Sequence, residues 1–91
     1  MAIAIYFPAP SFTKDQYDEG VRKLEEAGAG SPPGRLYHCA FEGGIGVHVF
    51  DVWESQEAFD KFGETLMPIL GELGADPGEP QIATVHNTIV G

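Results

Sequence analysis

Apolar residues recur along this chain in two rhythms, the strict alternation typical of strands and the three-to-four spacing typical of helices. Residues 2–7 alternate, but both sets of positions are largely apolar, which predicts a strand buried on both faces. Thr13 and Gln16 form a capping-box pattern in front of a helix predicted over about residues 14–27. Two acid-first pairs should support the outer face of this helix, Asp18 with Arg22 and Glu19 with Lys23.

A β-hairpin is predicted after the Gly- and Pro-rich connection 28–34. Residues 36–41 and 47–54 have the composition of strands, and they flank the glycine-rich reversal 42–46. With a five-residue loop, the expected cross-strand pairs are Phe41 with Val47, Cys39 with Val49, and Tyr37 with Asp51.

The register of this hairpin decides which side chains share a face. The five-residue loop would place His38 and His48 on the same face. A two-residue turn at Gly43–Gly44 is the alternative, and it would exchange the faces of one strand relative to its partner.

A second helix should begin after Ser55, which is a plausible N-cap. Its buried stripe is marked by Ala58, Phe59, Phe62 and Leu66. Pro68 predicts a break, followed by a short further helix to about Leu73. Asp76-Pro-Gly78 is a turn signature, and residues 81–90 predict the last strand.

The element order β-α-β-β-α-β predicts a single α+β domain over residues 1–91, with a ferredoxin-like four-stranded antiparallel sheet. The right-handed crossover rule places both helices on one face of the sheet. Because the other face still carries apolar residues on every strand, we expect a second copy of the chain to cover it in a homodimer.

Charge limits the choice of partners. The chain has 14 acidic against five basic residues and a net charge of −9, so nucleic acid and anionic membranes are not expected partners. The apolar start has no basic segment before it and ends at Pro8, too early for a signal peptide or a membrane span. The single cysteine, Cys39, cannot form an internal disulfide. These features predict a cytoplasmic protein.

One segment resembles a known group of proteins. Asp51–Phe59 reads Asp-Val-Trp-Glu-Ser-Gln-Glu-Ala-Phe, in which a strand ends in Val-Trp and a serine caps the next helix. This arrangement resembles the dimeric α+β barrel superfamily, and within it the antibiotic biosynthesis monooxygenases. The resemblance implies a dimeric α+β barrel. Members of that superfamily include oxygenases that use neither metal nor flavin, haem-degrading enzymes, isomerases and decarboxylases.

The same resemblance limits the cofactors that can be expected. Haem-degrading members take a histidine ligand from the helix after the Trp-bearing strand and use an asparagine on the first strand. This chain has no histidine between residues 55 and 82 and no asparagine in its first strand. The cofactor-independent oxygenases are similar to it at Trp53, but they have polar groups where this chain has Val49 and Phe59. We therefore expect no cofactor.

Histidine is the natural candidate for proton transfer, because its ordinary pKa lies near neutrality. The chain has three histidines, His38, His48 and His86. His38 and His48 could reach a shared ligand in the five-residue register, but their spacing matches no metal motif, and no metal is expected. Asp51 interrupts an apolar strand and needs a partner there. Beside Tyr37 it would be a candidate base.

Two alternatives remain open at this point. A salt bridge from Asp51 to Arg35 would give that carboxylate a purely structural role. Six aromatic residues could line a ligand pocket between sheet and helices or form a solid core: Tyr6, Tyr37, Phe50, Trp53, Phe59 and Phe62. The leading hypothesis is a protein that binds an apolar or aromatic small molecule, as a cofactor-independent monooxygenase or isomerase. The alternative is a non-catalytic dimeric ligand-binding or accessory module.

Overall fold

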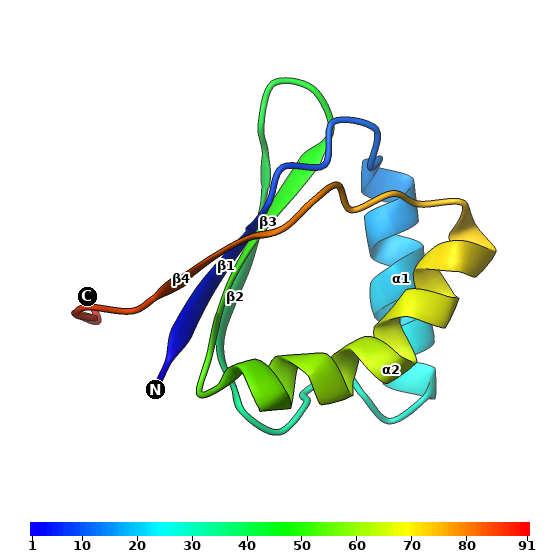
Figure 1. Ribbon diagram of the computed structural model, residues 1–91. Coiled ribbons are helices and arrows are strands. Elements are labelled where there is room, and N and C mark those ends of the chain that lie inside the picture. Colours follow the sequence, from blue (N-terminus) through cyan, green and yellow to red (C-terminus); the bar gives the residue numbers. More distant parts are fainter.

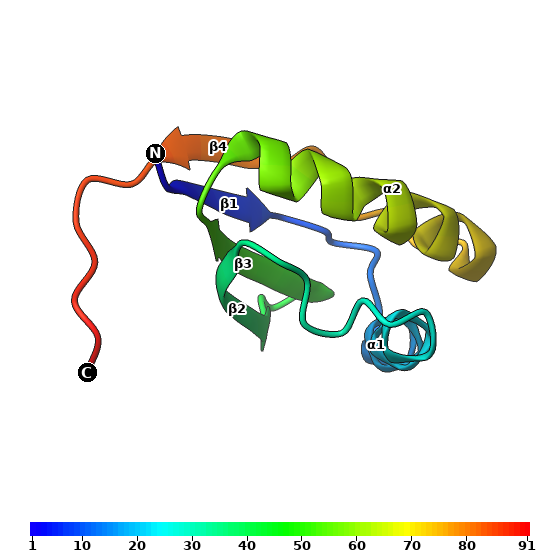
Figure 2. The same ribbon diagram turned by 90° about the horizontal axis from the view of Figure 1, so that it is seen from below.

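The computed structural model describes all residues, Met1–Gly91, and contains four strands and two helices. In chain order these are β1 (Ile3–Phe7), α1 (Lys14–Glu26), β2 (Arg35–Glu42), β3 (Val47–Trp53), α2 (Gln56–Leu73) and β4 (Gln81–Thr84). The sheet order is β2-β3-β1-β4 with antiparallel neighbours throughout. Both helices lie on one face of the sheet and leave the other face open (Figures 1 and 2). The predicted α+β, ferredoxin-like fold is confirmed. Neither helix has the length and apolar character needed to cross a membrane.

Both helices begin at the predicted caps. The Thr13 side chain accepts from the backbone N–H of Gln16, whose own side chain accepts from the backbone N–H of Thr13. Ser55 caps α2 by accepting from the N–H of Ala58 at 3.1 Å. The predicted i,i+4 ion pairs on α1 are wrong. Arg22 pairs with Glu19 and Glu26, and Lys23 reaches Glu72 on α2.

The predicted break at Pro68 is also wrong, because α2 continues through the proline to Leu73 and ends at Gly74 with a φ of 64°. A proline removes one intrahelical donor. Ile69 and Leu70, directly after it, are both buried. Their packing holds the final turns of the helix against the core, so tertiary contacts override the local preference for a break.

The β2–β3 hairpin has a register that differs from both expectations. Glu42 pairs with Val47, so the loop spans residues 43–46, and the predicted pairing of Phe41 with Val47 is off by one residue. The loop is closed by the N–H of Gly43, which donates to the carbonyl of Gly46 at 3.2 Å.

This shift of one residue turns β2 over relative to β3. His38 lies opposite Asp51, on the face that the helices cover, whereas His48 is on the open face. The predicted proximity of His38 and His48 is therefore wrong. The two-residue turn would have given the observed faces, although not the observed pairs.

A β-bulge interrupts the start of β2. Tyr37 lies opposite Val52, but the next pair joins Arg35 to Trp53, so Leu36 is the extra residue. In an uninterrupted strand Arg35 would share the open face with Tyr37. The bulge turns the Arg35 side chain toward the helices instead.

The last strand ends earlier than predicted, at Thr84. Thr84 pairs with Ile3, and the N–H of Val85 donates to the carbonyl of Ala2 at 3.0 Å. The residues after Val85 pair with no strand. These residues extend away from the body of the domain (Figure 2).

The core consists of two apolar clusters between the sheet and the helices. One contains Ala9, Phe12, Val47, Val49 and Leu70. The other contains Ile3, Ile5, Trp53 and Phe62.

Two glycines allow the loops at one end of the sheet to close around Pro8–Pro10. Gly46 and Gly78 have φ values of 76° and 74°. A Cβ on Gly46 would lie 2.6 Å from the carbonyl oxygens of Ala9 and Pro10, and one on Gly78 would lie 2.8 Å from that of Pro8. Both positions therefore exclude any side chain.

Candidate functional site

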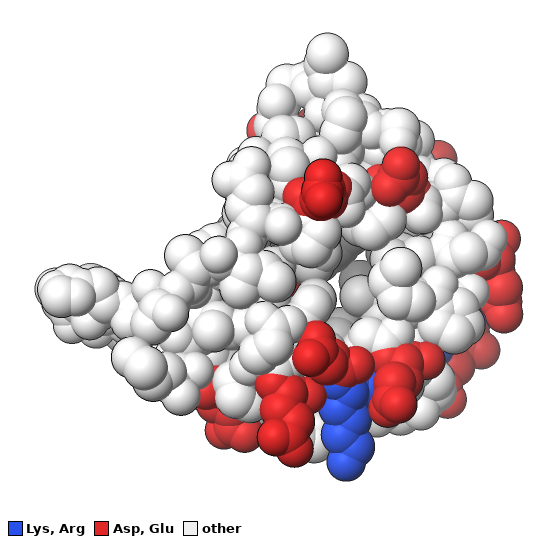
Figure 3. Space-filling view, viewed as in Figure 1, with Lys and Arg blue, Asp and Glu red and all other residues white.

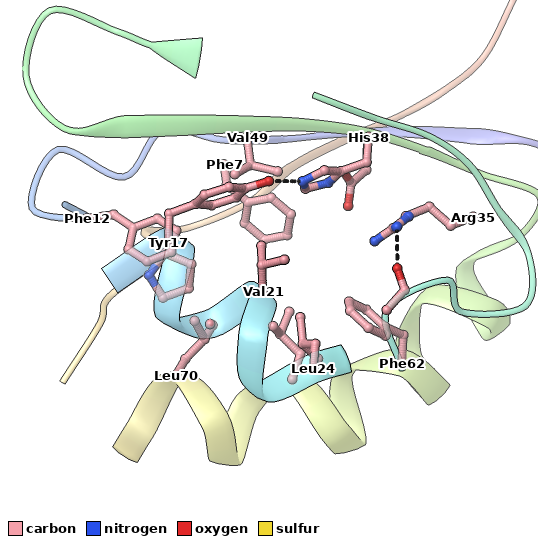
Figure 4. A pocket seen from close by; sticks show the side chains of 15 residues that line it. Phe7, Phe12, Tyr17, Val21, Leu24, Arg35, His38, Val49, Phe62 and Leu70 are labelled. Atoms are coloured by element: carbon pink, nitrogen blue, oxygen red, sulfur yellow. Dashed lines mark hydrogen bonds and ion pairs between the residues drawn. The ribbon is translucent and has the colours of Figure 1, made fainter. Parts of the chain in front are cut away.

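A cavity of about 170 Å³ lies between the sheet and the helices. It takes lining residues from both apolar clusters, and a hollow is visible near the middle of this side of the molecule (Figure 3). The apolar lining includes Phe7, Phe12, Val21, Leu24, Val49, Phe62, Leu66 and Leu70. Polar groups reach it in only one region, where Tyr17, Arg35, His38 and Asp51 contribute to the wall (Figure 4).

Three of these polar residues form a chain of hydrogen bonds. His38 Nδ1 lies 2.5 Å from Asp51 Oδ1, and His38 Nε2 lies 2.7 Å from the hydroxyl of Tyr17. An ionised carboxylate can only accept, so with a neutral imidazole Nδ1 carries the proton and Nε2 accepts from Tyr17. Figure 4 shows the Tyr17 hydroxyl, which comes from α1, pointing at the His38 ring on β2.

Asp51 is the buried end of this chain. It is only 4% exposed, in the middle of β3. Its second oxygen accepts from the indole N–H of Trp53 at 3.2 Å, and Trp53 itself is fully buried. A buried carboxylate that is fixed by two donors can hold an imidazole in one orientation and one tautomer. Asp51 therefore orients His38, and its predicted contacts with Tyr37 or Arg35 are not present.

The surroundings of Tyr17 keep its hydroxyl protonated, so that it can act as a hydrogen-bond donor. Burial is the largest cause that raises the pKa of Tyr17 above its ordinary value of 10.0, and the positive charge of Arg35 works in the opposite direction. The phenol therefore stays protonated at neutral pH and can donate to His38 Nε2.

This shift predicts an effect on stability at high pH. Below about pH 10 Tyr17 is neutral in both the folded and unfolded states, but above it the unfolded chain ionises first, so the free energy of unfolding falls as pH rises through the folded pKa. Tyr17→Phe should make this fall shallower in urea titrations followed by circular dichroism. Parallel pH curves for Tyr17→Phe and the parent protein would contradict the assignment.

Of the four candidate catalytic residues, the structure brings together His38 and Asp51. His48 lies on the open face, where Nδ1 is 2.6 Å from the hydroxyl of Tyr6. His86 is exposed in the segment after β4. Neither His48 nor His86 contributes to the cavity wall. No group of three or more His, Cys, Asp and Glu side chains is arranged to hold a metal ion.

The six candidate ligand-binding aromatics divide into three sets. Phe62 lines the cavity. Trp53 and Phe59 pack against each other in the core, with ring centroids 5.6 Å apart, and are not part of the cavity wall. The remaining three, Tyr6, Tyr37 and Phe50, lie on the open face and cannot line this cavity, because the register places them there.

Sequence reasoning missed two polar residues of the site. No sequence pattern singles out Tyr17, although a buried tyrosine usually needs a partner for its hydroxyl. The sequence suggests Arg35 only as a partner for Asp51, because the bulge that redirects its side chain has no clear sequence signal.

The comparisons with known proteins agree with this fold. No protein-family model matches the sequence, and no curated protein is similar enough to match. Among solved structures, a candidate antibiotic biosynthesis monooxygenase from Chloroflexus aurantiacus superposes with a TM-score of 0.67 at 17% identity, covering 99% of this chain and 98% of that chain. SnoaB, a cofactor-independent oxygenase from Streptomyces nogalater, gives 0.62 at 14% identity, covering 97% and 94%.

A third structure contains a ligand. The monooxygenase ActVA-Orf6 from Streptomyces coelicolor, in complex with nanaomycin D, gives a TM-score of 0.53 at 21% identity and covers 99% of this chain and 90% of that chain. At such identities the similarity shows the fold. The chain therefore shares the fold of these monooxygenases, as the resemblance at Asp51–Phe59 predicted.

Proposed function

We propose that this chain binds a phenolic aromatic compound in the cavity between sheet and helices and oxidises it with molecular oxygen, without metal or flavin. The observation that carries this proposal is the hydrogen-bonded chain Asp51–His38–Tyr17 in the wall of an otherwise apolar cavity. The oxygenases SnoaB and ActVA-Orf6 share the fold and support the reaction class.

His38 is the base in this proposal. Asp51 holds Nδ1, so the lone pair of Nε2 is directed at Tyr17 and the cavity. A phenol bound there donates to Nε2 directly, or donates to the Tyr17 oxygen while Tyr17 passes its own proton to His38. Proton transfer by a positioned histidine contributes about 10²–10⁴-fold to a rate.

The reaction balances without an external reductant. Loss of the phenolic proton to His38 gives a phenolate, which transfers one electron to O2. The resulting superoxide and aryl radical combine at the para carbon to form a C–O bond. The peroxide takes a proton from His38, and loss of the carbon-bound hydrogen with cleavage of the O–O bond gives a quinone and water. The phenol is oxidised and O2 is reduced, with one oxygen atom in each product.

The size of the cavity limits the substrate. Its volume of about 170 Å³ is close to that of the cavity of about 150 Å³ that binds benzene. One or two fused rings therefore fill it, and the remainder of a larger compound must protrude from it.

Oxygen uptake with 1-naphthol tests this function. We expect consumption of O2 and formation of 1,4-naphthoquinone, with one atom of ¹⁸O from ¹⁸O2 in the product by mass spectrometry. Binding without O2 uptake would contradict oxygenation and favour a non-catalytic ligand-binding module. That alternative has one observation in its favour, because Trp53 gives its indole N–H to Asp51 and has no free polar group for a substrate. Deuterium exchange into the ring without O2 uptake would favour an isomerase.

We expect the open face of the sheet to be buried against a second copy of this chain. Tyr37 and Phe41 are 55% and 42% exposed there, beside the half-buried Phe50 and Val52. Contiguous apolar patches on a surface often mark protein–protein interaction sites. We expect dimers in sedimentation velocity at micromolar concentration, and monomers for the double variant Tyr37→Glu, Phe41→Glu. Met67→Glu, an exposed apolar position on α2, is the matched control. A monomeric parent protein would contradict the homodimer.

A further inference from the structure

Arg35 is a cation whose charge is not neutralised by a neighbour. Of the five basic side chains, Lys14, Arg22 and Lys23 each pair with a carboxylate. Arg35 has no ion-pair partner and uses its guanidinium in one hydrogen bond, to the carbonyl of Gly30 at 3.0 Å. Both Arg35 and Gly30 line the cavity.

The backbone at the start of β2 directs the Arg35 side chain toward the cavity. The β-bulge between Arg35 and Tyr37 places Arg35 opposite Trp53, on the face that the helices cover. Bulges are frequent beside functional sites, where they redirect a side chain. The bond to Gly30 then fixes one end of the guanidinium and leaves its other N–H donors free (Figure 4).

The charge of Arg35 also acts at the reacting end of the cavity. It lowers the pKa of Tyr17, against the larger effect of burial. The positive charge of Arg35 therefore reaches Tyr17, where the negative charges of Asp51 and Asp18 oppose it.

We propose that Arg35 binds an anionic oxygen of the ligand, a carboxylate or a phenolate carried on an aromatic ring, and thereby selects anionic aromatic compounds for this cavity. Guanidinium groups bind such oxygens with two parallel donors, and a dry apolar wall strengthens the interaction. This inference deepens the proposed function and rests on the same cavity, but it concerns binding and needs no turnover.

Matched pairs of ligands test the inference by isothermal titration calorimetry without oxygen. The carboxylate arm compares 2-naphthoate with the neutral 2-naphthamide, and the phenolate arm compares 1-naphthol with 1-methoxynaphthalene. Arg35→Gln should weaken binding of 2-naphthoate, of 1-naphthol or of both by about 10–100-fold, and should change binding of 2-naphthamide and 1-methoxynaphthalene by less than about twofold. The arm that responds identifies the source of the anionic oxygen.

Two further variants complete the design. Arg35→Lys should restore only part of the affinity, because an ammonium lacks the paired donors of a guanidinium. Arg22→Gln, a surface arginine on α1 paired with Glu19 and Glu26, should bind all four probes as the parent protein does. Unchanged affinity of Arg35→Gln for 2-naphthamide and 1-methoxynaphthalene shows that the cavity of this variant is intact.

The inference is overturned if Arg35→Gln leaves binding of both 2-naphthoate and 1-naphthol unaffected, if it weakens all four probes equally, or if the parent protein binds none of the four. Its failure is distinct from failure of the proposed function. Oxidation of 1-naphthol with no dependence of affinity on Arg35 would remove the inference alone, whereas Arg35-dependent binding without O2 uptake would remove oxygenation alone.

Discussion

His38→Gln is expected to lower the turnover number for 1-naphthol oxidation by about 10²–10⁴-fold. Glutamine has a similar length, and its amide can still donate to Asp51, but it has no basic nitrogen to accept a proton. Because the lost interaction develops in the transition state, the turnover number should fall much more than the affinity for 1-naphthol. Steady-state O2 uptake and calorimetric binding measure the two quantities separately.

His86→Gln is the control for this variant. His86 is exposed after β4 and has no part in the cavity wall, so its replacement should leave turnover and binding unchanged. A turnover number for His38→Gln within about threefold of the parent value would exclude His38 as the general base.

Trp53→Ala is expected to have the largest effect on stability, a loss of about 3–5 kcal/mol in the free energy of unfolding. Trp53 is fully buried, and its ring packs on Phe59 and Phe62 with centroid distances of 5.6 and 5.2 Å. Its removal leaves a void and deprives the buried Asp51 of a donor. Since small domains are stable by only about 5–15 kcal/mol, the variant should be close to unfolding at 25 °C.

Urea unfolding at fixed protein concentration, followed by circular dichroism, measures this loss. Trp53→Phe keeps most of the ring volume and should cost less than Trp53→Ala, with the difference reporting the void. A free energy of unfolding for Trp53→Ala within about 1 kcal/mol of the parent value would show that the site can collapse around the missing ring.

Local signals in the sequence were sufficient for the fold. Thr13 and Ser55 mark the starts of both helices through hydrogen bonds within a few residues, and such short-range chemistry is readable from the letters. The alternation of residues along the chain predicted the strands. The break predicted at Pro68 was wrong because long-range packing decides the course of α2. Ile69 and Leu70 are buried against distant residues, and this packing keeps the helix intact beyond the proline.

The site was harder to predict than the fold because it depends on register. A single residue of shift in the hairpin exchanges the faces on which His38 and Tyr37 lie. The contact that completes the site joins Tyr17 to His38 across 21 residues of chain, and no local pattern encodes it. Asp51 was recognisable, since a carboxylate in an apolar strand needs a partner, but the identity of that partner is a property of the tertiary structure.

Gly46 and Gly78, where any Cβ would collide with backbone oxygens of Pro8–Pro10, offer a practical signature for remote relatives. At 14–21% identity most side chains of the compared structures have diverged from this chain, whereas a steric exclusion by main-chain atoms tolerates no replacement. A search template could require a Pro-x-Pro segment directly after the first strand and a glycine in each of these two loops. Such a template should recover chains whose loops pack in the same way even when their cavity residues differ.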